Sequence, residues 1–307
     1  MIKVFIDGSA GTTGLRIADR LNLRQDISII RLTEERRKDP EARKEAINSA
    51  DVVFLCLPDD AAREAAAMVQ NDRVKIIDTS TAHRTHPDWV YGFPELQGQR
   101  EKIRQSNRIA NPGCHASGFV ALVAPLVQAG ILPADAALTC FSLTGYSGGG
   151  KKMIAQYETP DRSPLLKGPR QYGLTQQHKH LPEMKALCGL EKSPAFCPVV
   201  GDFYSGMEVT VPLFAGDITA SAEEIRSLYR SYYPSGLVRV DDSADPDGML
   251  SAAAFSGRDD LQIGVYGNEE RILLVSRFDN LGKGASGAAI QNMNILMGLP
   301  EETGLSV

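Results

Sequence analysis

The chain has 307 residues, of which 43% are hydrophobic and 23% are charged, and its formal net charge is −5. This composition is typical of a globular protein of about two domains, and it disfavours nucleic acid as a partner because a basic footprint is lacking. No apolar run reaches the ~20 residues that a membrane span needs, and no signal-peptide pattern opens the chain. The five cysteines are dispersed without a CxxC pair, so we expect a cytoplasmic protein with neither disulfides nor a metal site.

The first hundred or so residues alternate short β-branched runs with helical patterns. Such alternation predicts a parallel, doubly wound α/β sheet that binds ligands at the carboxyl ends of its strands. The expected strands are residues 2–6, 27–32, 51–57, 74–78 and 108–111, and the expected helices are residues 14–23, 39–48 and 60–70.

A glycine-rich loop connects the first expected strand to the first expected helix. Its GxxGxxG spacing partly matches the dinucleotide fingerprint, in which glycines allow a tight turn and the helix N-terminus holds a pyrophosphate. We predict that this loop binds a cofactor, and a glycine turn without a ligand is the alternative. The residues concerned are Gly8, Ser9, Ala10, Gly11, Thr12, Thr13 and Gly14.

The residues after the second expected strand bear on the choice of cofactor. Glu34 follows Gly14 by 20 residues, where an acid could hold a ribose, but Arg31, Arg36 and Arg37 crowd the same place and suit a 2′-phosphate. A solvated, charged helix start explains these residues equally well. The pattern leans to NADP(H), with Arg36 as a candidate ligand.

Cys114 ends the tetrapeptide Asn-Pro-Gly-Cys, which lies between a short apolar run and an amphipathic helix pattern over residues 116–129. This arrangement would place the thiol at a helix N-terminus, where negative charge is favoured and a thiolate nucleophile can form. A buried cysteine in a turn is the alternative. Cys114 is therefore the candidate nucleophile.

The pattern changes after Cys114. Longer-spaced strand candidates at residues 138–144, 207–213, 263–266 and 272–278 predict an antiparallel or mixed sheet in a second domain. A last helix is expected at residues 286–297, and residues 157–172 and 240–249 are expected to be the least ordered.

A second glycine cluster, residues 145–152, comes within one residue of a P-loop. Lys152 stands where a hydroxyl should hold magnesium, so nucleotide hydrolysis is disfavoured. Backbone N–H groups of Gly148 and Gly149 beside Lys151 could still form an anion pocket, and a flexible loop is the alternative.

A histidine pair, His178 and His180, would face one direction on an extended segment. A general acid/base role near pH 7 is one interpretation, and a surface loop or, less favoured, a zinc site are the others. His115 adjoins the cysteine, but its side chain is expected to point away from Cys114. A thiolate, a histidine and a dinucleotide loop together predict a reductase that forms a cysteinyl thioester and reduces it with hydride to an aldehyde.

Several motifs carry a resemblance to a known family. They are the Gly8–Gly14 loop, Asp-Thr-Ser at 78–80 with Arg84, Tyr-Gly-Phe-Pro-Glu at 91–95, the Cys114 tetrapeptide, the 145–151 cluster, His-Lys-His-Leu-Pro-Glu at 178–183 and the stretch 279–287. Over nearly its whole length the chain resembles the shorter type of the N-acetyl-γ-glutamyl-phosphate reductases, relatives of aspartate-semialdehyde dehydrogenase. His115-Ala116-Ser117 and the loop sequence GSAGTTG depart from the longer type.

The resemblance implies roles for particular residues. Cys114 would be the nucleophile and His180 the acid/base, with His178 as the second choice. NADPH would be the cofactor and N-acetyl-L-glutamyl 5-phosphate the substrate. Candidate cofactor ligands then include Ser80 and Gly282, and candidate substrate or phosphate ligands are Arg84, Asn111, Gly148, Gly149, Lys151 and Glu183. For Arg84 the alternative is a surface ion pair of little energy.

The resemblance also implies the architecture. A Rossmann dinucleotide-binding domain, residues 1–113 with 285–307, would be joined to an inserted α+β substrate and oligomerisation domain with a mixed sheet, residues 114–284. The chain would assemble as a homo-oligomer, a dimer of dimers. Reduction of another acyl phosphate, a cysteine hydrolase or acyltransferase, and a non-catalytic dinucleotide-binding protein remain the competing functions.

Overall fold

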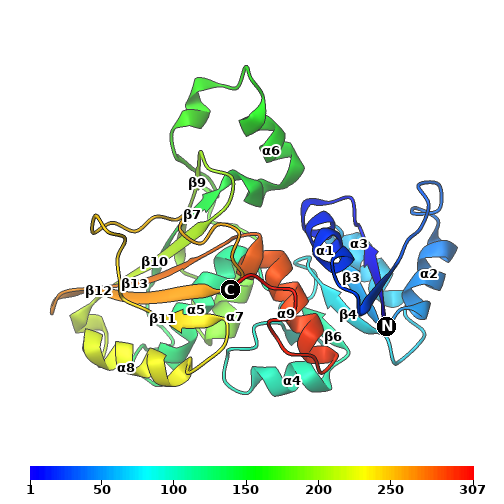
Figure 1. The fold of residues 1–307 in the computed structure, drawn as a ribbon. Coiled ribbons are helices and arrows are strands. Elements are labelled where there is room, and N and C mark those ends of the chain that lie inside the picture. The colour runs from blue at the N-terminus through cyan, green and yellow to red at the C-terminus, as the bar shows by residue number, and fades with distance from the viewer. The chain divides into compact units, whose positions relative to one another are not determined.

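The computed structural model describes residues 1–307, which fold into two compact units (Figure 1). Unit 1 comprises residues 1–94, 98–112 and 285–305, and unit 2 comprises residues 95–97, 113–284 and 306–307. The chain passes from unit 1 to unit 2 between Pro112 and Gly113, so Cys114 lies at the very start of the long segment of unit 2.

Unit 1 is built on a six-stranded, wholly parallel sheet with the strand order β2-β1-β3-β4-β6-β5. The predicted doubly wound α/β class is confirmed. Its strands are β1 (Ile2–Asp7), β2 (Ile27–Ile30), β3 (Val52–Leu55), β4 (Lys75–Asp78), β5 (Val90–Tyr91) and β6 (Arg108–Ala110). Its helices are α1 (Thr12–Asn22), α2 (Pro40–Ser49), α3 (Asp59–Ala67), α4 (Gln99–Gln105) and α9 (Gly287–Leu296).

Alternate residues of these strands supply two separate cores, one on each face of the sheet. Val4 and Phe54 pack with residues of α1 and α9, whereas Phe5 and Val53 pack with residues of α2 and α3. The strands read as continuous apolar runs because both faces are covered.

Unit 2 is built on a seven-stranded mixed sheet with the order β11-β12-β13-β10-β7-β9-β8. β7 pairs in parallel with β9 and β11 with β12, while the other neighbours are antiparallel. The predicted second domain with a mixed sheet is thus confirmed. The strands are β7 (Thr139–Gly145), β8 (Arg170–Gln171), β9 (Ala195–Gly201), β10 (Met207–Phe214), β11 (Val238–Val240), β12 (Leu261–Gly267) and β13 (Arg271–Phe278).

Helices cover one face of this sheet. Helix α5 is apolar on every side and is buried against β10, β13 and α7. The helices are α5 (Cys114–Gln128), α6 (Gly150–Glu158), α7 (Leu181–Cys188) and α8 (Ala222–Tyr232), with short turns η1 (Tyr146–Gly149), η2 (Pro164–Lys167), η3 (Ala215–Asp217) and η4 (Gly282–Ser286). None of the helices has the length and apolar character that crossing a membrane requires.

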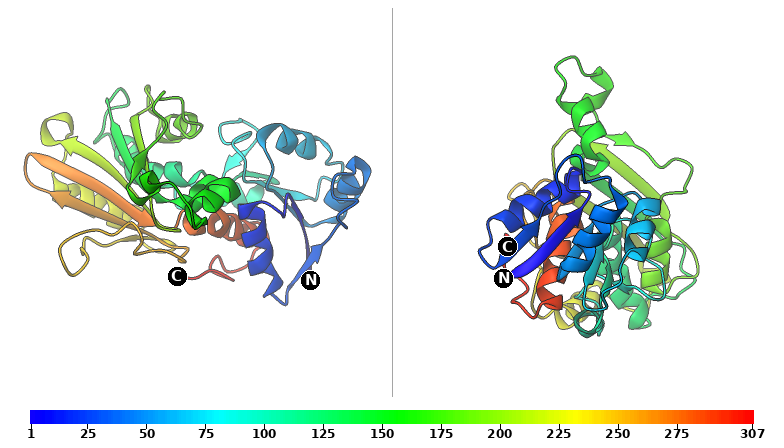
Figure 2. Two further views of the ribbon diagram at one scale, coloured as in Figure 1. Left: turned by 90° about the horizontal axis from the view of Figure 1, so that it is seen from above. Right: turned by 90° about the vertical axis from the view of Figure 1, so that its right-hand side faces the viewer.

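Helix α6 and the residues after it project beyond the sheet of unit 2 (Figures 1 and 2). Tyr157, Leu166 and Val200 form a small core beneath this projection, against which Tyr172 packs. Residues 157–172, expected to be among the least ordered, therefore contain the short elements η2 and β8 and contribute to a local core.

Candidate active site

Cys114 is the first residue of α5, as the sequence predicted. No side chain caps this helix at Gly113, and the orphan N–H groups of the first turn favour a negative charge beside them. The Gly113 N–H donates to Oε2 of Glu183 at 3.1 Å, and Glu183 is only 1% exposed. Glu183 of α7 thus fixes the turn from which Cys114 projects.

Gly284 covers one side of the cysteine. A Cβ at this position would lie 2.8 Å from Cys114 Cβ, a distance that real Cβ atoms do not show. The Gly284 N–H donates to the carbonyl of Asp279, whose carboxylate accepts from the Leu281 N–H at 2.7 Å. Gly284 thus permits close packing against Cys114.

His180 and His115 both lie beside Cys114. The sulfur of Cys114 and one nitrogen of each imidazole lie within 4.8 Å of one another. The expectation that His115 points away from Cys114 is wrong, because the second residue of the helix turns its ring towards the same side as the first. The imidazoles are thus neighbours of the thiol, and either could exchange a proton with the sulfur on closing to hydrogen-bond distance.

His178 packs against His180, with 4.7 Å between ring centroids. The two residues lie in a turn that leads into α7, not on the extended segment that we expected, because His180 is the N-cap of α7 and Pro182 favours a helix start there. The His180 N–H donates to Nδ1 of His178 at 3.2 Å, so a neutral His178 carries its proton on Nε2.

The sequence did not single out Tyr172. Its hydroxyl lies 2.7 Å from Nε2 of His115, whose Nδ1 lies 2.7 Å from the Ser142 hydroxyl. Burial, with smaller contributions from His178 and Lys179, lowers the pKa of His115 to about 3, so its imidazole is neutral near pH 7. Only the short strand β8 before Tyr172 could have marked this position.

One thiol and two imidazoles could in principle ligate zinc. Both nitrogens of His115, however, already have hydrogen-bond partners at 2.7 Å. The geometry therefore favours hydrogen bonding and proton transfer as the use of this cluster.

Unit 1 contains a pocket of about 610 Å³ at the carboxyl ends of its strands. Gly8, Ser9 and Ala10 of the glycine loop line it. Gly8 has φ +88°, a conformation that side chains disfavour, and a Cβ there would collide with the Cys56 carbonyl. No side chain caps the following α1, so the loop and helix N-terminus suit a pyrophosphate.

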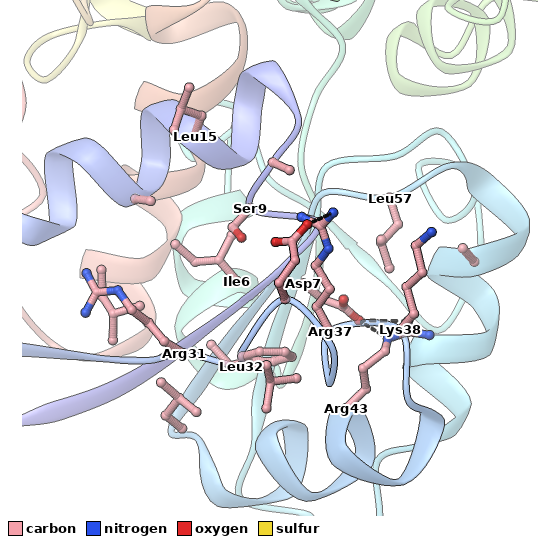
Figure 3. A pocket seen from close by; sticks show the side chains of 18 of the residues that line it. Ile6, Asp7, Ser9, Leu15, Arg31, Leu32, Arg37, Lys38, Arg43 and Leu57 are labelled. Carbon is pink, nitrogen blue, oxygen red and sulfur yellow. Dashed lines mark hydrogen bonds and ion pairs between the residues drawn. The ribbon is translucent and has the colours of Figure 1, made fainter.

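The part of this pocket that residues 31–43 line carries many charged side chains (Figure 3). Arg43 pairs with Asp7 at 2.8 Å, and Arg37 pairs with Glu34. The cationic residues that line the pocket are Arg31, Arg37, Lys38 and Arg43. Arg36 is not among them, because its side chain contacts Glu45 at 3.4 Å, and its role as a cofactor ligand stays a prediction.

Three further candidates lie at the carboxyl ends of β4 and β6. Ser80 donates to the buried carboxylate of Asp78 at 2.7 Å. Arg84 is 9% exposed and donates to the carbonyls of Asn111 and Thr79, so it is not the surface ion pair that we considered as an alternative. The Asn111 side chain donates to the Ala285 carbonyl and accepts from Asn292.

The second glycine cluster is ordered. Gly148 and Gly149 lie in η1 and are exposed, and Lys151 is exposed in the first turn of α6. Gly282 is buried in unit 2, where a Cβ would collide with the Arg258 carbonyl. The ligand roles of these residues stay predictions.

Two protein-family models match the chain. The NAD binding domain of semialdehyde dehydrogenases matches residues 3–106, and their dimerisation domain matches residues 114–280. Among solved structures, aspartate semialdehyde dehydrogenase II of Vibrio cholerae in complex with ASA superposes with a TM-score of 0.71 at 16% identity, covering 97% of this chain and 98% of that one. Aspartate semialdehyde dehydrogenase of Candida albicans with NADP gives a TM-score of 0.66 at 16% identity over 97% of this chain and 99% of that one.

Relatives with higher identity share one description. N-acetyl-gamma-glutamyl-phosphate reductase 2 of Nostoc sp. is 48% identical over 99% of both chains. N-acetyl-gamma-glutamyl-phosphate reductase of Sinorhizobium medicae is 47% identical over 96% of this chain and 98% of its own. With the site geometry above, this similarity over the full length shows that the chain belongs to the N-acetyl-gamma-glutamyl-phosphate reductase family of semialdehyde dehydrogenases.

Proposed function

We propose that the protein reduces N-acetyl-L-glutamyl 5-phosphate to N-acetyl-L-glutamate 5-semialdehyde with NADPH and releases phosphate, a step of arginine biosynthesis. The observation that carries this proposal is Cys114 at the N-terminus of α5 with a nitrogen of His180 within 4.8 Å of its sulfur. The names of the relatives at 43–48% identity supply the substrate class.

Cys114 performs the first step. Its thiolate attacks the acyl carbon of the acyl phosphate, the bond to the phosphate oxygen breaks, and phosphate leaves a thioester on sulfur. The N-terminal end of α5 stabilises the thiolate before attack, and the hydrogen bond from Gly113 to Glu183 holds that end in place.

His180 handles the protons. It accepts the thiol proton before attack, and when the tetrahedral oxyanion collapses to the aldehyde it returns that proton to the departing sulfur, which leaves as the thiol. His178 packs on His180 and is the second choice for this role.

NADPH supplies the hydride when it is bound. The pocket of unit 1 fits its adenosine part, because the glycine loop permits close approach of a pyrophosphate and Arg31, Arg37 and Lys38 can neutralise a 2′-phosphate. A lining that mixes apolar and charged side chains and a volume of about 610 Å³ suit a ligand of nucleotide size.

Lys151 and the backbone of Gly148 and Gly149, all exposed in unit 2, are the groups that we propose for the anionic ends of the substrate. Ammonium groups bind phosphate and carboxylate strongly. Arg84, Asn111 and Glu183 hold the backbone near them in place, since all three side chains are buried and bonded to main-chain groups.

The decisive assay runs the reaction backwards. N-acetylglutamate semialdehyde, NADP⁺ and inorganic phosphate should yield NADPH, and omission of phosphate should abolish turnover beyond one NADPH per site because the thioester then has no acceptor. Parallel assays in the forward direction compare N-acetylglutamyl, aspartyl and carrier-bound glutamyl phosphates. Equal or faster turnover of aspartyl phosphate would overturn the substrate that we propose.

An exposed apolar face of the sheet in unit 2 is suited to contact with a second copy of the chain. Phe141, Leu273 and Phe214 lie on the face of its sheet opposite to α5, and they are 41%, 40% and 64% exposed. The matching family model describes this part of the chain as a dimerisation domain. We propose a homo-oligomer through this face, as a dimer of dimers, in the cytoplasm, where thiols such as Cys114 stay reduced.

A further inference from the structure

A chain of hydrogen bonds in unit 2 leads from a buried serine to the surroundings of Cys114. Ser142 Oγ lies 2.7 Å from His115 Nδ1, and His115 Nε2 lies 2.7 Å from the Tyr172 hydroxyl. Ser142 is fully buried in β7, whereas Tyr172 is partly exposed. The chain thus has a closed end at Ser142 and an accessible end at Tyr172.

The protons of this chain can be placed in two ways. A neutral imidazole has one N–H donor and one acceptor nitrogen. With the proton on Nδ1, His115 donates to Ser142 and accepts the only hydroxyl proton of Tyr172. With the proton on Nε2, Ser142 donates to Nδ1, His115 donates to the Tyr172 oxygen, and the Tyr172 proton is directed away from His115.

The Tyr172 hydroxyl can donate a hydrogen bond to a negative charge at Cys114. Burial, and secondly the charge of Cys114, raises the pKa of Tyr172, so its hydroxyl stays a proton donor near neutral pH. The Tyr172 hydroxyl lies 2.7 Å from Nε2 of His115, and a nitrogen of that imidazole lies within 4.8 Å of the Cys114 sulfur, so the hydroxyl belongs to the surroundings of the sulfur. A phenol that donates to the thiolate or to a developing oxyanion stabilises it.

Packing fixes the ring of His115. Phe196 lies 5.2 Å from it, and His178 and His180 each lie 5.5 Å from it between ring centroids. The Tyr172 N–H donates to the Pro198 carbonyl at 3.0 Å, so the backbone of the tyrosine is fixed as well. Both members of the pair are therefore held in the geometry of their hydrogen bond.

We propose that His115 is a positioning residue that donates from Nε2 to Tyr172 and directs the Tyr172 hydroxyl proton at the negative charge beside Cys114. This rests on the proposed function, because the charge is that of the thiolate and of the tetrahedral intermediate formed on it. Ser142 sets the tautomer of His115 by donating to Nδ1. This relay, the hydrogen-bonded chain Ser142–His115–Tyr172, takes up no net proton.

Alkylation of Cys114 by iodoacetamide at a series of pH values tests the proposal in the full-length protein, with mass spectrometry of the Cys114 peptide as the readout. Tyr172→Phe and His115→Phe should each raise the pH of half-maximal alkylation by about one unit, since one hydrogen bond to a charged group is lost. The double variant should match Tyr172→Phe alone, because His115 acts through the tyrosine. Additive shifts, or no shift in His115→Phe, would overturn the proposal.

Two conservative variants separate positioning from mere packing. His115→Gln retains an N–H close to the Nε2 position and should keep the alkylation profile near that of the wild type, whereas His115→Asn reaches only towards Ser142 and should behave as His115→Phe. The reverse order would contradict the proposed tautomer. Thermal melts of each variant confirm that it is folded. If the shifts in the alkylation profiles only follow the loss of melting temperature of the variants, the positioning role is also contradicted.

Alkylation requires neither NADPH nor an acyl phosphate. Absence of turnover with N-acetylglutamyl phosphate in the wild type would therefore overturn the proposed function while the alkylation profiles still decide on the relay. Where turnover is present, Tyr172→Phe and His115→Phe should lower kcat about tenfold with little effect on the Kd for NADPH.

Discussion

At the scale of single residues, the site depends on one sulfur atom. Cys114→Ser retains the size of the side chain but replaces a thiol by a hydroxyl, which does not ionise near neutral pH. We expect kcat to fall by at least ~10³-fold, because removal of a nucleophile abolishes the covalent route. NADPH titration by fluorescence should give an unchanged Kd, since the cofactor pocket lies within unit 1. Retained turnover would remove the thioester from the mechanism.

His180 and His178 can be distinguished by the same substitution at both positions. His180→Asn should lower kcat by about 10²–10⁴-fold, the range of general acid/base catalysis, while His178→Asn should have a smaller effect. Steady-state kinetics at saturating NADPH provide the comparison, and the Kd for NADPH serves as control. If His178→Asn is the more damaging change, the acid/base assignment moves to His178.

The sequence singled out Cys114, His178 and His180, but it did not single out Tyr172, whose hydroxyl lies beside His115. Cys114 is recognisable because an apolar run, a glycine and a helix pattern meet there. Tyr172 and His115 are not, because their pairing joins a loop to a helix across 57 positions of the sequence and depends on how both pack against β7 and β9. Arg36 and Arg37 show the same limit, since the sequence cannot tell which arginine of a run lines the pocket.

At the scale of elements, long periodic segments were predictable and short ones were not. The strands β1, β2, β3, β4 and β6 of the parallel sheet and the helices α1, α2 and α3 agree with the expected ranges to within a few residues. The two-residue strands β5 and β8 have no period to read, and α7 is only eight residues long. β9 was missed because Pro198 interrupts its apolar run, although it pairs with β7 over its full length.

The segment between β2 and α2 yields a prediction on cofactor preference. Arg37 lines the pocket of unit 1, and its neighbour Arg36 does not. Arg37→Ala removes one cation and releases Glu34 from its ion pair, so we expect the Kd for NADPH to rise about tenfold or more with little change for NADH. Titration of both nucleotides measures the preference, and Arg36→Ala is the matched control. Equal losses for NADPH and NADH would place the 2′-phosphate elsewhere.

At the scale of the whole molecule, we expect the exposed face of the sheet in unit 2 to form the interface between copies of the chain. Phe141→Glu combined with Leu273→Glu places two charges on that face and should dissociate the oligomer, because buried charges without partners are costly at an interface. Sedimentation velocity measures the change in mass. Leu165→Glu, at a leucine of η2 that is 76% exposed, is the control and should leave the mass unchanged. An unaltered mass of the double variant would place the interface on another surface.

The buried imidazole of His115 also links the stability of the folded chain to pH. Its pKa is lowered to about 3 by burial, whereas an unfolded histidine takes up a proton near pH 6.5. Between these values the unfolded state binds one more proton at this position, so acidification favours unfolding. The stability that this group contributes is fully present above pH ~6.5 and is lost as the pH falls towards 3, by at most about 1.4 kcal/mol for each pH unit.

Urea unfolding at pH 7, 6 and 5 measures this dependence. His115→Phe should unfold with a shallower dependence of the free energy of unfolding on pH than the wild type, because the group that titrates only in the unfolded state is gone. His86→Ala changes a histidine whose side chain is 47% exposed and should retain the wild-type slope. Equal slopes for the wild type and His115→Phe would show that the imidazole is protonated in the folded state, and the tautomer on which the orientation of Tyr172 depends would then not exist.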